Sequence, residues 1–260
     1  MQGGGPVGHA VITGASAGIG EAVARALAGR GYAVTLVARR AELLAGLASS
    51  LGAQAQVFAR DLSDVEHATD FLPAAEAHFG PVDILINNAG VQYLGAFAEF
   101  DAERGEQLLR LNLLTPLRLT RAVLPGMVQR GRGAIVDVAS LAAIAPTPYM
   151  AYYNASKAGL AAASESLRAE VAGSGVHVVT VYPGPVDTAM GRAGYEAYGD
   201  SLAVRATPIG TTEEMALRVL QALDDRDDRV IYPKAYWAAR WFPGITRTFL
   251  DKFTPRPKST

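Results

Sequence analysis

The chain has 260 residues, of which 50% are hydrophobic and 19% are charged, a composition that is typical of a globular protein and excludes a wholly disordered one. Its formal net charge of −1 leaves no basic excess to hold DNA or RNA, so no nucleic-acid partner is expected. Cysteine is absent and only four histidines occur, which excludes disulfides, thiolate nucleophiles and cysteine-ligated zinc, and no metal site is predicted.

Residues 1–8 are predicted to form a flexible leader, because this glycine-rich segment has neither the basic nor the apolar region of a signal peptide. No run approaches the roughly 18 consecutive apolar residues that a membrane-spanning helix needs. We therefore expect a cytoplasmic protein.

Seven short apolar runs follow, and helical patterns alternate with them, as in βαβ units around a parallel sheet. Most runs are apolar at successive positions, which indicates strands that helices cover on both faces. The predicted strands are residues 9–13, 33–39, 54–59, 82–87, 133–139, 177–182 and 229–232. The predicted helices are residues 18–30, 41–51, 63–79, 102–129, 149–172 and 212–224, with Ser63 and Thr212 in positions suited to N-capping.

No repeat, low-complexity segment or linker divides residues 9–233, so we predict a single doubly wound α/β domain with a seven-stranded, mostly parallel sheet and helices on both faces. Residues 185–211 form a long irregular insertion, and such loops are typical of lids or binding loops. Residues 234–260 are a distinct C-terminal tail that is rich in basic and aromatic residues.

A glycine-rich turn at residues 13–20 follows the first predicted strand and runs into a helix. Glycine lets the backbone approach a ligand closely, and a helix N-terminus offers unpaired N–H groups to a pyrophosphate. The spacing is not GxGxxG, and the alternative is a tight connection without a ligand. After the first strand of an α/β pattern, the turn predicts a dinucleotide site. The candidate residues are Gly14, Ser16, Ala17, Gly18, Ile19 and Gly20.

The second predicted strand ends in Ala38-Arg39-Arg40, where an NAD site usually carries an acid that binds the ribose hydroxyls. A guanidinium binds a 2′-phosphate through paired hydrogen bonds, whereas a carboxylate would repel it. Arg39 and Arg40 therefore favour NADP(H) over NAD(H). The alternative is two solvated arginines at the start of a helix.

Tyr153 and Lys157 are four residues apart in a predicted helix and therefore share one face. A free tyrosine titrates near pH 10, so it exchanges protons at neutral pH only if a close ammonium, assisted by a positive nicotinamide ring, stabilises its phenolate. Tyr152 is five residues from Lys157 and is expected to point away. This spacing alone occurs by chance on many helices and does not identify an active site.

Five motifs follow one another along the chain: the turn at 13–20, Asn87-Asn88-Ala89-Gly90, Ser140, Tyr153 with Lys157, and Pro183-Gly184. In this order and spacing, the chain resembles the short-chain dehydrogenase/reductase family over residues 9–233. The resemblance implies a single Rossmann-type domain that transfers a hydride between NAD(P)(H) and a carbonyl or a secondary alcohol.

The resemblance also implies catalytic roles. Tyr153 would be the general acid of carbonyl reduction or the base of alcohol oxidation, and Lys157 would lower its pKa and bind the nicotinamide ribose. Ser140 would form a hydrogen bond to the substrate oxygen. Asn112 would bind a water that joins Lys157 to solvent, and its alternative is a buried asparagine that is satisfied within the protein.

Further cofactor contacts are implied in the same way. Asp61 and Leu62 would contact the adenine, Asn88 would brace the cofactor loop, and the Val186 backbone with the Thr188 hydroxyl would orient the nicotinamide carboxamide. The full set beyond the glycine turn and the two arginines is Asp61, Leu62, Asn88, Ala89, Gly90, Tyr153, Lys157, Pro183, Gly184, Val186 and Thr188.

The expected substrate walls are mostly apolar, which favours a lipophilic carbonyl. They are residues 92–94, 141–143 and 146–150, with Met190, Tyr195, Tyr198, Leu202 and Ile209 of the lid. The sequence thus predicts NADP(H)-dependent reduction of a carbonyl to a secondary alcohol, or the reverse. NAD-dependent oxidation of an alcohol or polyol is one alternative. A non-catalytic dinucleotide-sensing protein is another, disfavoured because the four catalytic candidates are all present.

The tail from residue 234 to 260 holds six Lys/Arg, one acid and six aromatic residues, a charge of +5 against −6 for the rest of the chain. Such a segment either contacts a membrane interface or packs over its own pocket or a neighbouring subunit. The resemblance further implies a homodimer or homotetramer built on residues 102–129 and 149–172.

Overall fold

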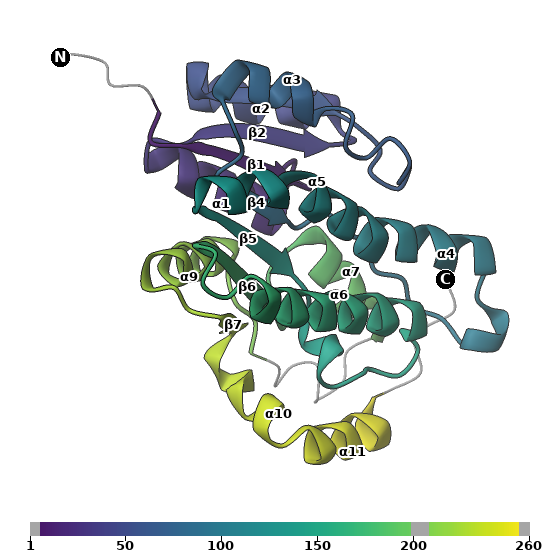
Figure 1. Cartoon of the computed structure of the whole chain (residues 1–260). Helices are drawn as coiled ribbons and strands as arrows, with labels where there is room; N and C mark the ends of the chain where they lie inside the picture. The colour runs from purple at the N-terminus through teal and green to yellow at the C-terminus, as the bar shows by residue number, and fades with distance from the viewer. Residues whose placement is uncertain (1–5, 199–207, 255–260) are drawn as a thin grey trace.

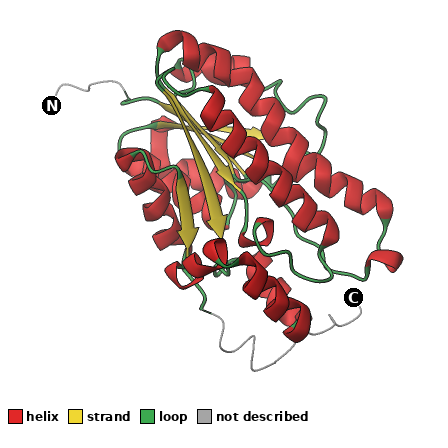
Figure 2. Cartoon of the chain, turned by 60° about the horizontal axis from the view of Figure 1, so that its bottom comes forward, coloured by secondary structure: helices red, strands yellow, loops and turns green. Residues whose placement is uncertain are grey.

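The computed structural model describes residues 6–198 and 208–254, and its centre is one sheet of seven parallel strands (Figures 1 and 2). The strand order is β3-β2-β1-β4-β5-β6-β7. The strands are β1 (His9–Thr13), β2 (Ala33–Ala38), β3 (Ala55–Ala59), β4 (Ile84–Asn87), β5 (Gly133–Val138), β6 (Val176–Pro183) and β7 (Arg229–Tyr232). The predicted strands and fold class are confirmed.

Helices cover both faces of the sheet, because alternate residues of each buried strand point to opposite sides. One apolar core joins strand residues such as Ile12 and Leu36 to α1 (Gly18–Gly29), α2 (Ala41–Leu51) and α9 (Thr212–Asp225). A second core joins residues such as Val11 and Leu85 to α3 (Leu72–Phe79), α5 (Thr115–Arg130) and the end of α6 (Ala151–Glu170).

The strand order reverses between β1 and β4. The chain moves outward from β1 through β2 to β3 and then returns to pair β4 with β1, in the register Val11 to Leu85. The connections that leave β1 and β4 diverge at this point, which produces a crevice at the carboxyl edge of the sheet.

The predicted helix over residues 63–79 is wrong in its first half, since α3 begins only at Leu72. Pro73 lies in the first turn of α3, and a proline further inside a helix would remove a backbone donor and clash with the preceding turn. Ser63 is not an N-cap either, because its N–H and hydroxyl both donate to Asp61 Oδ1. The N-cap of α9 is Thr211, whose Oγ1 accepts from Glu214 N at 3.1 Å, and not Thr212.

The predicted helix over residues 102–129 forms in three parts. These are α4 (Ala102–Leu109), a π-helical turn η3 (Arg110–Leu114) and α5. Pro116 has no N–H for the carbonyl of Asn112, which disfavours an uninterrupted α-helical register at this point. The turn widens the helix where the buried Asn112 faces inward.

The predicted irregular insertion contains the helix α7 (Ala189–Tyr198), and its ends are tied together. Gly210 N donates to Pro185 O and Asp187 N donates to Gly210 O, both at 2.9 Å. The tail forms α10 (Trp237–Trp241) and α11 (Pro243–Phe253), below β7 and α6 in Figure 1. Within the described ranges, no helix is long and apolar enough to cross a bilayer.

Candidate active site

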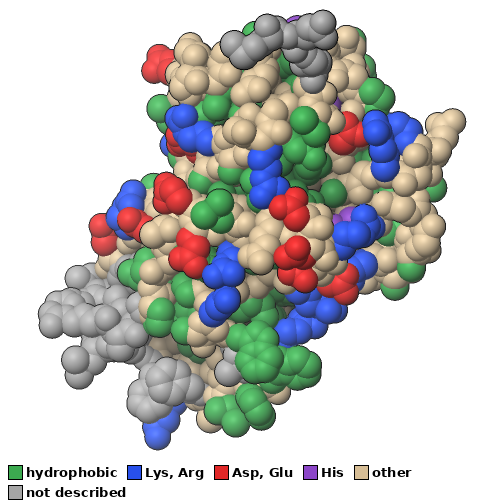
Figure 3. All heavy atoms as spheres, turned by 90° about the vertical axis from the view of Figure 1, so that its left-hand side faces the viewer, with side chains coloured by type: hydrophobic (Ala, Val, Ile, Leu, Met, Phe, Trp, Pro, Cys, Tyr) green, Lys and Arg blue, Asp and Glu red, His purple; other side chains and the backbone are tan. Residues whose placement is uncertain are grey.

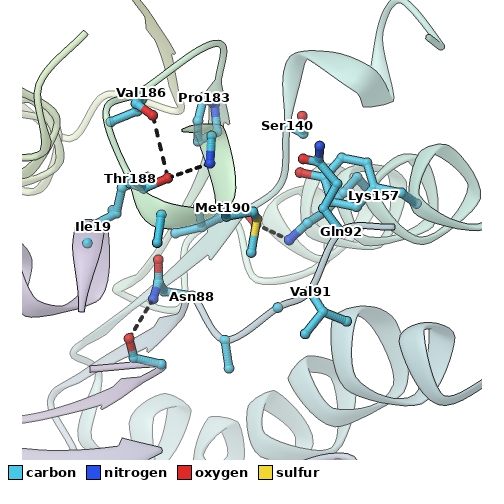
Figure 4. A pocket seen from close by; sticks show the side chains of 18 of the residues that line it. Ile19, Asn88, Val91, Gln92, Ser140, Lys157, Pro183, Val186, Thr188 and Met190 are labelled. Carbon is cyan, nitrogen blue, oxygen red and sulfur yellow. Dashed lines mark hydrogen bonds between the residues drawn. The ribbon is translucent and has the colours of Figure 1, made fainter. Parts of the chain in front are cut away.

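A cavity of about 510 Å³ opens at the carboxyl edge of the sheet, where the strand order reverses. Its walls come from the segments that follow β1 to β6 and from the first turns of α6 and α7 (Figure 4). The predicted site residues line this cavity except for two, Gly20 and Asn112. The structure thus brings together residues that are far apart in the sequence.

The glycine turn after β1 forms one end of the cavity. Gly14 and Gly18 have φ angles of 67° and 61°, which side-chain-bearing residues rarely adopt. A Cβ at Gly14 would lie 2.8 Å from Asn88 Nδ2 and 2.9 Å from Ala89 Cα, so the turn packs directly on the β4 loop. The first turn of α1 has no side-chain cap, which leaves its N–H groups for an anion.

Arginine side chains surround the far end of the cavity, beside the glycine turn. Arg40 donates from Nε and Nη2 to Ser16 Oγ, at 3.1 and 2.8 Å, while Arg39 is exposed. Arg60 joins them, and Asp61 is the single acid in the described lining. Burial opposes ionisation of Asp61, but hydrogen bonds from Ser63 and the charge of Arg39 hold its pKa below the ordinary value. This end of the cavity suits a phosphate.

Thr13 and Asn88 fasten the glycine turn to the β4 loop. Thr13 Oγ1 accepts from the backbone N–H groups of Asn88 and Ala89, at 2.9 and 3.0 Å, and donates to Ile86 O. Asn88 Nδ2 returns a bond to Thr13 O at 2.9 Å. Gly20 lies behind this contact, since a Cβ there would collide with the Gly14 carbonyl and Asn88 Nδ2. Gly20 therefore shapes the turn without facing the cavity.

Tyr153 and Ser140 meet at the other end of the cavity. Tyr153 is 8% exposed on the first turns of α6, and Ser140 follows β5. Burial raises the pKa of Tyr153, and a hydrogen bond from Ser140 opposes the shift. Tyr152 turns away and packs against Phe97 and Phe100, with ring centroids 5.7 and 5.5 Å apart. Tyr153 lines the cavity, and Tyr152 does not.

Lys157 lies one turn after Tyr153 and is 5% exposed. Its Nζ donates to Val138 O at 2.7 Å. Burial lowers the pKa of Lys157 to about 8, and the carboxylate of Asp137 opposes this. Burial raises the pKa of Tyr153, and Lys157 is not among the groups that lower it. The predicted lowering of the Tyr153 pKa by Lys157 involves a positive nicotinamide ring and stays a prediction.

Asp137 supports Lys157 from behind the cavity wall. It is 3% exposed on β5, next to Val138, and its Oδ1 accepts from Asn87 Nδ2 at 2.8 Å. Burial raises the pKa of Asp137 to about 6, against hydrogen bonds from Asn87 and Ser164 and the charge of Lys157. A buried carboxylate thus compensates the buried ammonium.

Asn112 is fully buried in the π-helical turn and holds the loop that follows β4. Its Oδ1 accepts from Val91 N at 2.9 Å, and its Nδ2 donates to Val91 O at 2.8 Å and to Ser156 Oγ at 3.3 Å. A Cβ at Gly90 would lie 3.1 Å from Asn112 Oδ1 and 3.5 Å from Lys157 Nζ, so Gly90 keeps open the space between them. Asn112 is satisfied within the protein, and its predicted water relay stays a prediction.

The cavity mouth is formed by the β6 end and the start of α7. Thr188 Oγ1 accepts from Gly191 N at 2.9 Å and donates to Val186 O at 3.5 Å. Figure 4 shows Gln92 and Met190 close together at the cavity mouth, beside Lys157. Of the predicted walls, Gln92, Leu141, Ala142, Thr147, Met150 and Met190 line the cavity.

The other predicted wall residues do not line the cavity or are not described. Tyr93 instead lies under Arg104, whose Cζ is 3.9 Å from the ring centroid, and Ile209 is 54% exposed. Leu202 lies outside the described residues, as do the side chains of Tyr195 and Tyr198.

Comparisons with known proteins identify this arrangement. The family model for short chain dehydrogenases matches residues 8–198. The chain belongs to the short-chain dehydrogenase family. A ketoacyl reductase, HetN of Nostoc, is 34% identical over 85% of this chain and 77% of its own. A short-chain dehydrogenase from Sphingobium yanoikuyae, solved in complex with NADPH, is 32% identical with a TM-score of 0.79, over 98% of this chain and 99% of its own.

A second solved short-chain dehydrogenase, from Streptomyces avermitilis, has a TM-score of 0.81 and 30% identity, over 97% of each chain. The chain of 260 residues is accordingly an NAD(P)-dependent oxidoreductase with a nicotinamide dinucleotide as cofactor. The cavity fits that group, because glycines give it a close backbone approach and arginines surround one end.

The sequence reasoning missed three residues of this short-chain dehydrogenase that the structure places at the site. Arg60 directly precedes Asp61 and lines the cavity. The signal that could have identified it is a further basic residue at a strand end, like the two arginines after β2. Thr13 ends β1, and a hydroxyl at the end of an apolar run is the signal that could have indicated a tertiary hydrogen bond. Asp137 interrupts the apolar strand 133–138, and a lone carboxylate in a buried strand is the signal that could have revealed it.

Proposed function

We propose that the chain is an NADPH-dependent reductase that converts a lipophilic carbonyl compound to a secondary alcohol, with the reverse oxidation as its other direction. The observation that carries the proposal is that Tyr153, Ser140 and Lys157 line the same cavity as the uncapped α1 N-terminus. Proton-transfer groups and a phosphate-binding turn are thereby held at opposite ends of one space.

The preference for the phosphorylated dinucleotide rests on the arginines. Ser16, Arg39, Arg40 and Arg60 surround the end of the cavity near β2 and β3, and Arg40 already makes a forked contact to Ser16. A 2′-phosphate would complete this cluster of donors, whereas the adenosine ribose of NAD would leave its charges without a counter-ion. The NADPH bound to the Sphingobium relative agrees with this assignment.

The nicotinamide supplies a hydride to the carbonyl carbon when it is bound. Tyr153 would donate the proton from Oη to the carbonyl oxygen, and Ser140 would hold that oxygen through its hydroxyl. Lys157 would bind the nicotinamide ribose and stabilise the resulting phenolate. Thr188 and the Val186 backbone would orient the carboxamide, and Asp61 and Leu62 would contact the adenine.

The lipophilic substrate class follows from the cavity mouth. Leu141, Ala142, Met150 and Met190 give it an apolar wall, and Gln92 is a polar side chain close to Met190. Apolar walls with few polar groups bind a lipophilic ligand better than a small charged acid. The ketoacyl reductase relative acts on a carbonyl according to its name, which is consistent with this class.

A carbonyl panel tests the proposal. Aldehydes and ketones of increasing apolar size would be assayed by loss of NADPH absorbance, and again with NADH. We expect kcat/KM to increase with apolar size and to be at least about tenfold higher with NADPH. Oxidation of polyols with NAD alone would favour the alternative dehydrogenase, and NADPH binding without any turnover would favour a sensing protein.

A homodimer or homotetramer and a cytoplasmic location remain proposals of the same kind. Leu114, Leu117 and Val128 are exposed on η3 and α5, where apolar side chains would pack against a second copy. Sedimentation velocity of the purified protein tests the oligomeric state.

A further inference from the structure

Four large apolar side chains are exposed together on the C-terminal tail. Trp237, Trp241, Phe242 and Ile245 are 59%, 62%, 58% and 71% exposed, and we name them the aromatic patch. The rings of Trp237 and Trp241 are in contact, with centroids 5.7 Å apart. Figure 3 shows large hydrophobic side chains at the lower end of the molecule, with Lys and Arg side chains above them. So many exposed apolar groups in nine residues indicate a binding surface.

Polar side chains, and not the aromatic patch, attach the tail to the domain. Arg240 lies 3.4 Å from Glu165 of α6, and Arg247 donates to Ile144 O at 3.1 and 3.3 Å. Tyr236 packs beside Gly184, where a Cβ would lie 3.1 Å from its ring. A helix that packs only on its own domain usually buries its apolar side and exposes its charges. Here the guanidinium groups of Arg240 and Arg247 contact the domain, and the aromatic patch is exposed.

The charge around the aromatic patch is positive. Residues 234–254 contain Lys234, Arg240, Arg247 and Lys252 against a single acid, Asp251, and the whole tail carries +5. Tryptophan and phenylalanine side chains partition to the interfacial region of bilayers, and basic residues beside them are attracted to anionic headgroups. The patch therefore has both chemical features of a peripheral membrane contact.

A second copy of the chain fits this surface less well. In a two-fold symmetric dimer each patch would meet itself, so two tails of the same positive charge would face one another. An anionic bilayer offers an apolar layer for the aromatic groups and negative charge for the basic groups at the same time.

We propose that the aromatic patch inserts into the interface of a bilayer that contains anionic lipid, to which the net positive charge of the tail is attracted. This docking does not depend on the proposed reaction. It also places the bilayer beside the site, because Tyr236 packs against Gly184 and Leu141 neighbours the same glycine, and both Gly184 and Leu141 line the cavity.

The two tryptophans of the sequence are Trp237 and Trp241, so the intrinsic tryptophan emission of the full-length protein reports on the patch alone. The protein would be titrated with vesicles of phosphatidylcholine and with vesicles that also contain phosphatidylglycerol. We expect a blue shift of the emission with the anionic vesicles, quenching by brominated lipid, and weaker binding as salt is added. An emission spectrum that anionic vesicles leave unchanged at saturating lipid would overturn the proposal.

Matched variants locate the contact. Phe242→Ser with Ile245→Ser removes apolar area from the patch, and Leu217→Ser is the control, because Leu217 is 62% exposed on α9. We expect at least about a tenfold loss of vesicle affinity for the double variant and no loss for the control. Equal losses would contradict the patch. A patch buried between copies would also contradict it, shown by emission that is blue-shifted without lipid and shifts to the red on dilution.

Discussion

Asp137 lies behind the cavity wall and Lys157 lines the cavity, and these two buried groups of opposite charge affect the protonation of each other. Lys157 Nζ donates to the carbonyl of Val138, the residue after Asp137, so the ammonium is held close to this strand. Burial lowers the pKa of Lys157 to about 8, and Asp137 keeps it from falling further. We infer that Asp137 is a positioning residue that maintains the charge on Lys157 at neutral pH.

Asp137→Asn tests this role and keeps the shape of the side chain. Removal of the negative charge lowers the pKa of Lys157, so this ammonium loses its proton at lower pH. We expect the alkaline limb of kcat/KM for carbonyl reduction to shift down by about one pH unit. Asp83→Asn, at the opposite end of the strands, is the control and is expected to leave the profile in place. An unchanged profile for Asp137→Asn would mean a purely structural carboxylate.

Arg39→Ala tests the assignment of the cofactor phosphate. A charge-assisted hydrogen bond contributes roughly 1.5–3 kcal/mol, so the loss of Arg39 should raise the Kd of NADPH by about tenfold to a hundredfold. The Kd of NADH should change little. Arg25→Ala is the matched control, since Arg25 is exposed on α1 and pairs with Glu21. Fluorescence titration measures the Kd of both cofactors for the unmodified chain and the two variants, and equal losses for NADPH and NADH would refute the assignment.

At the residue scale the sequence motifs located most of the cavity lining, because each motif follows a strand and all strand ends meet at one edge of a parallel sheet. The hydrogen bonds between these residues could not be predicted from the motifs. Asn112 illustrates the difference, since its partner Val91 comes from a loop that the sequence pattern does not place.

At the scale of elements, the strands were predictable because buried parallel strands are short apolar runs between turn residues. The errors have local physical causes. Pro73 delays the start of α3, and Pro116 accompanies the π-helical turn that carries Asn112. A proline within the helical pattern was the sequence signal for both interruptions, and a prediction from apolar periodicity alone does not use this signal.

The N-cap of α9 provides a test at this scale. Thr211 accepts from Glu214 N, and loss of an N-cap hydroxyl costs about 1 kcal/mol of the free energy of unfolding. Thr211→Ala should therefore destabilise the protein by that amount in urea denaturation. Thr212→Ala is the neighbouring control and should remain within about 0.5 kcal/mol of the unmodified chain. A larger loss of stability for Thr212→Ala than for Thr211→Ala would show that Thr212 is the N-cap.

At the scale of the whole molecule, Glu165 joins the domain to its tail. Its Oε1 accepts from Tyr182 Oη at 2.6 Å and from Arg229 Nε at 2.8 Å, and Arg240 of α10 lies 3.4 Å away. The hydrogen bond from Arg229 is the largest influence, and with Tyr182 and Arg240 it lowers the pKa of Glu165 to about 2, although burial opposes the shift. The stabilisation that this charge provides is therefore complete above the ordinary pKa of 4.5 and is lost progressively as the pH falls from there to about 2.

Glu165→Gln removes this charge and should loosen the tail. We expect amide hydrogen exchange in residues 234–253 to become faster, with the strands of the sheet unchanged. Glu170→Gln on the same helix is the control, because Glu170 is exposed and contacts only Ser166, at 3.4 Å, among the hydrogen bonds of the described residues. Equal exchange in both variants would show that other contacts hold the tail.

One phenol, that of Tyr153, is proposed to transfer the proton that accompanies hydride transfer. The most direct measurement compares Tyr153→Phe with the unmodified chain, using the best carbonyl substrate of the panel and NADPH. A positioned general acid contributes roughly 10²–10⁴-fold to a rate, so we expect kcat to fall by about a thousandfold while the Kd of NADPH stays the same. Carbonyl reduction within a few-fold of the unmodified rate, with the cofactor fully bound, would contradict the account.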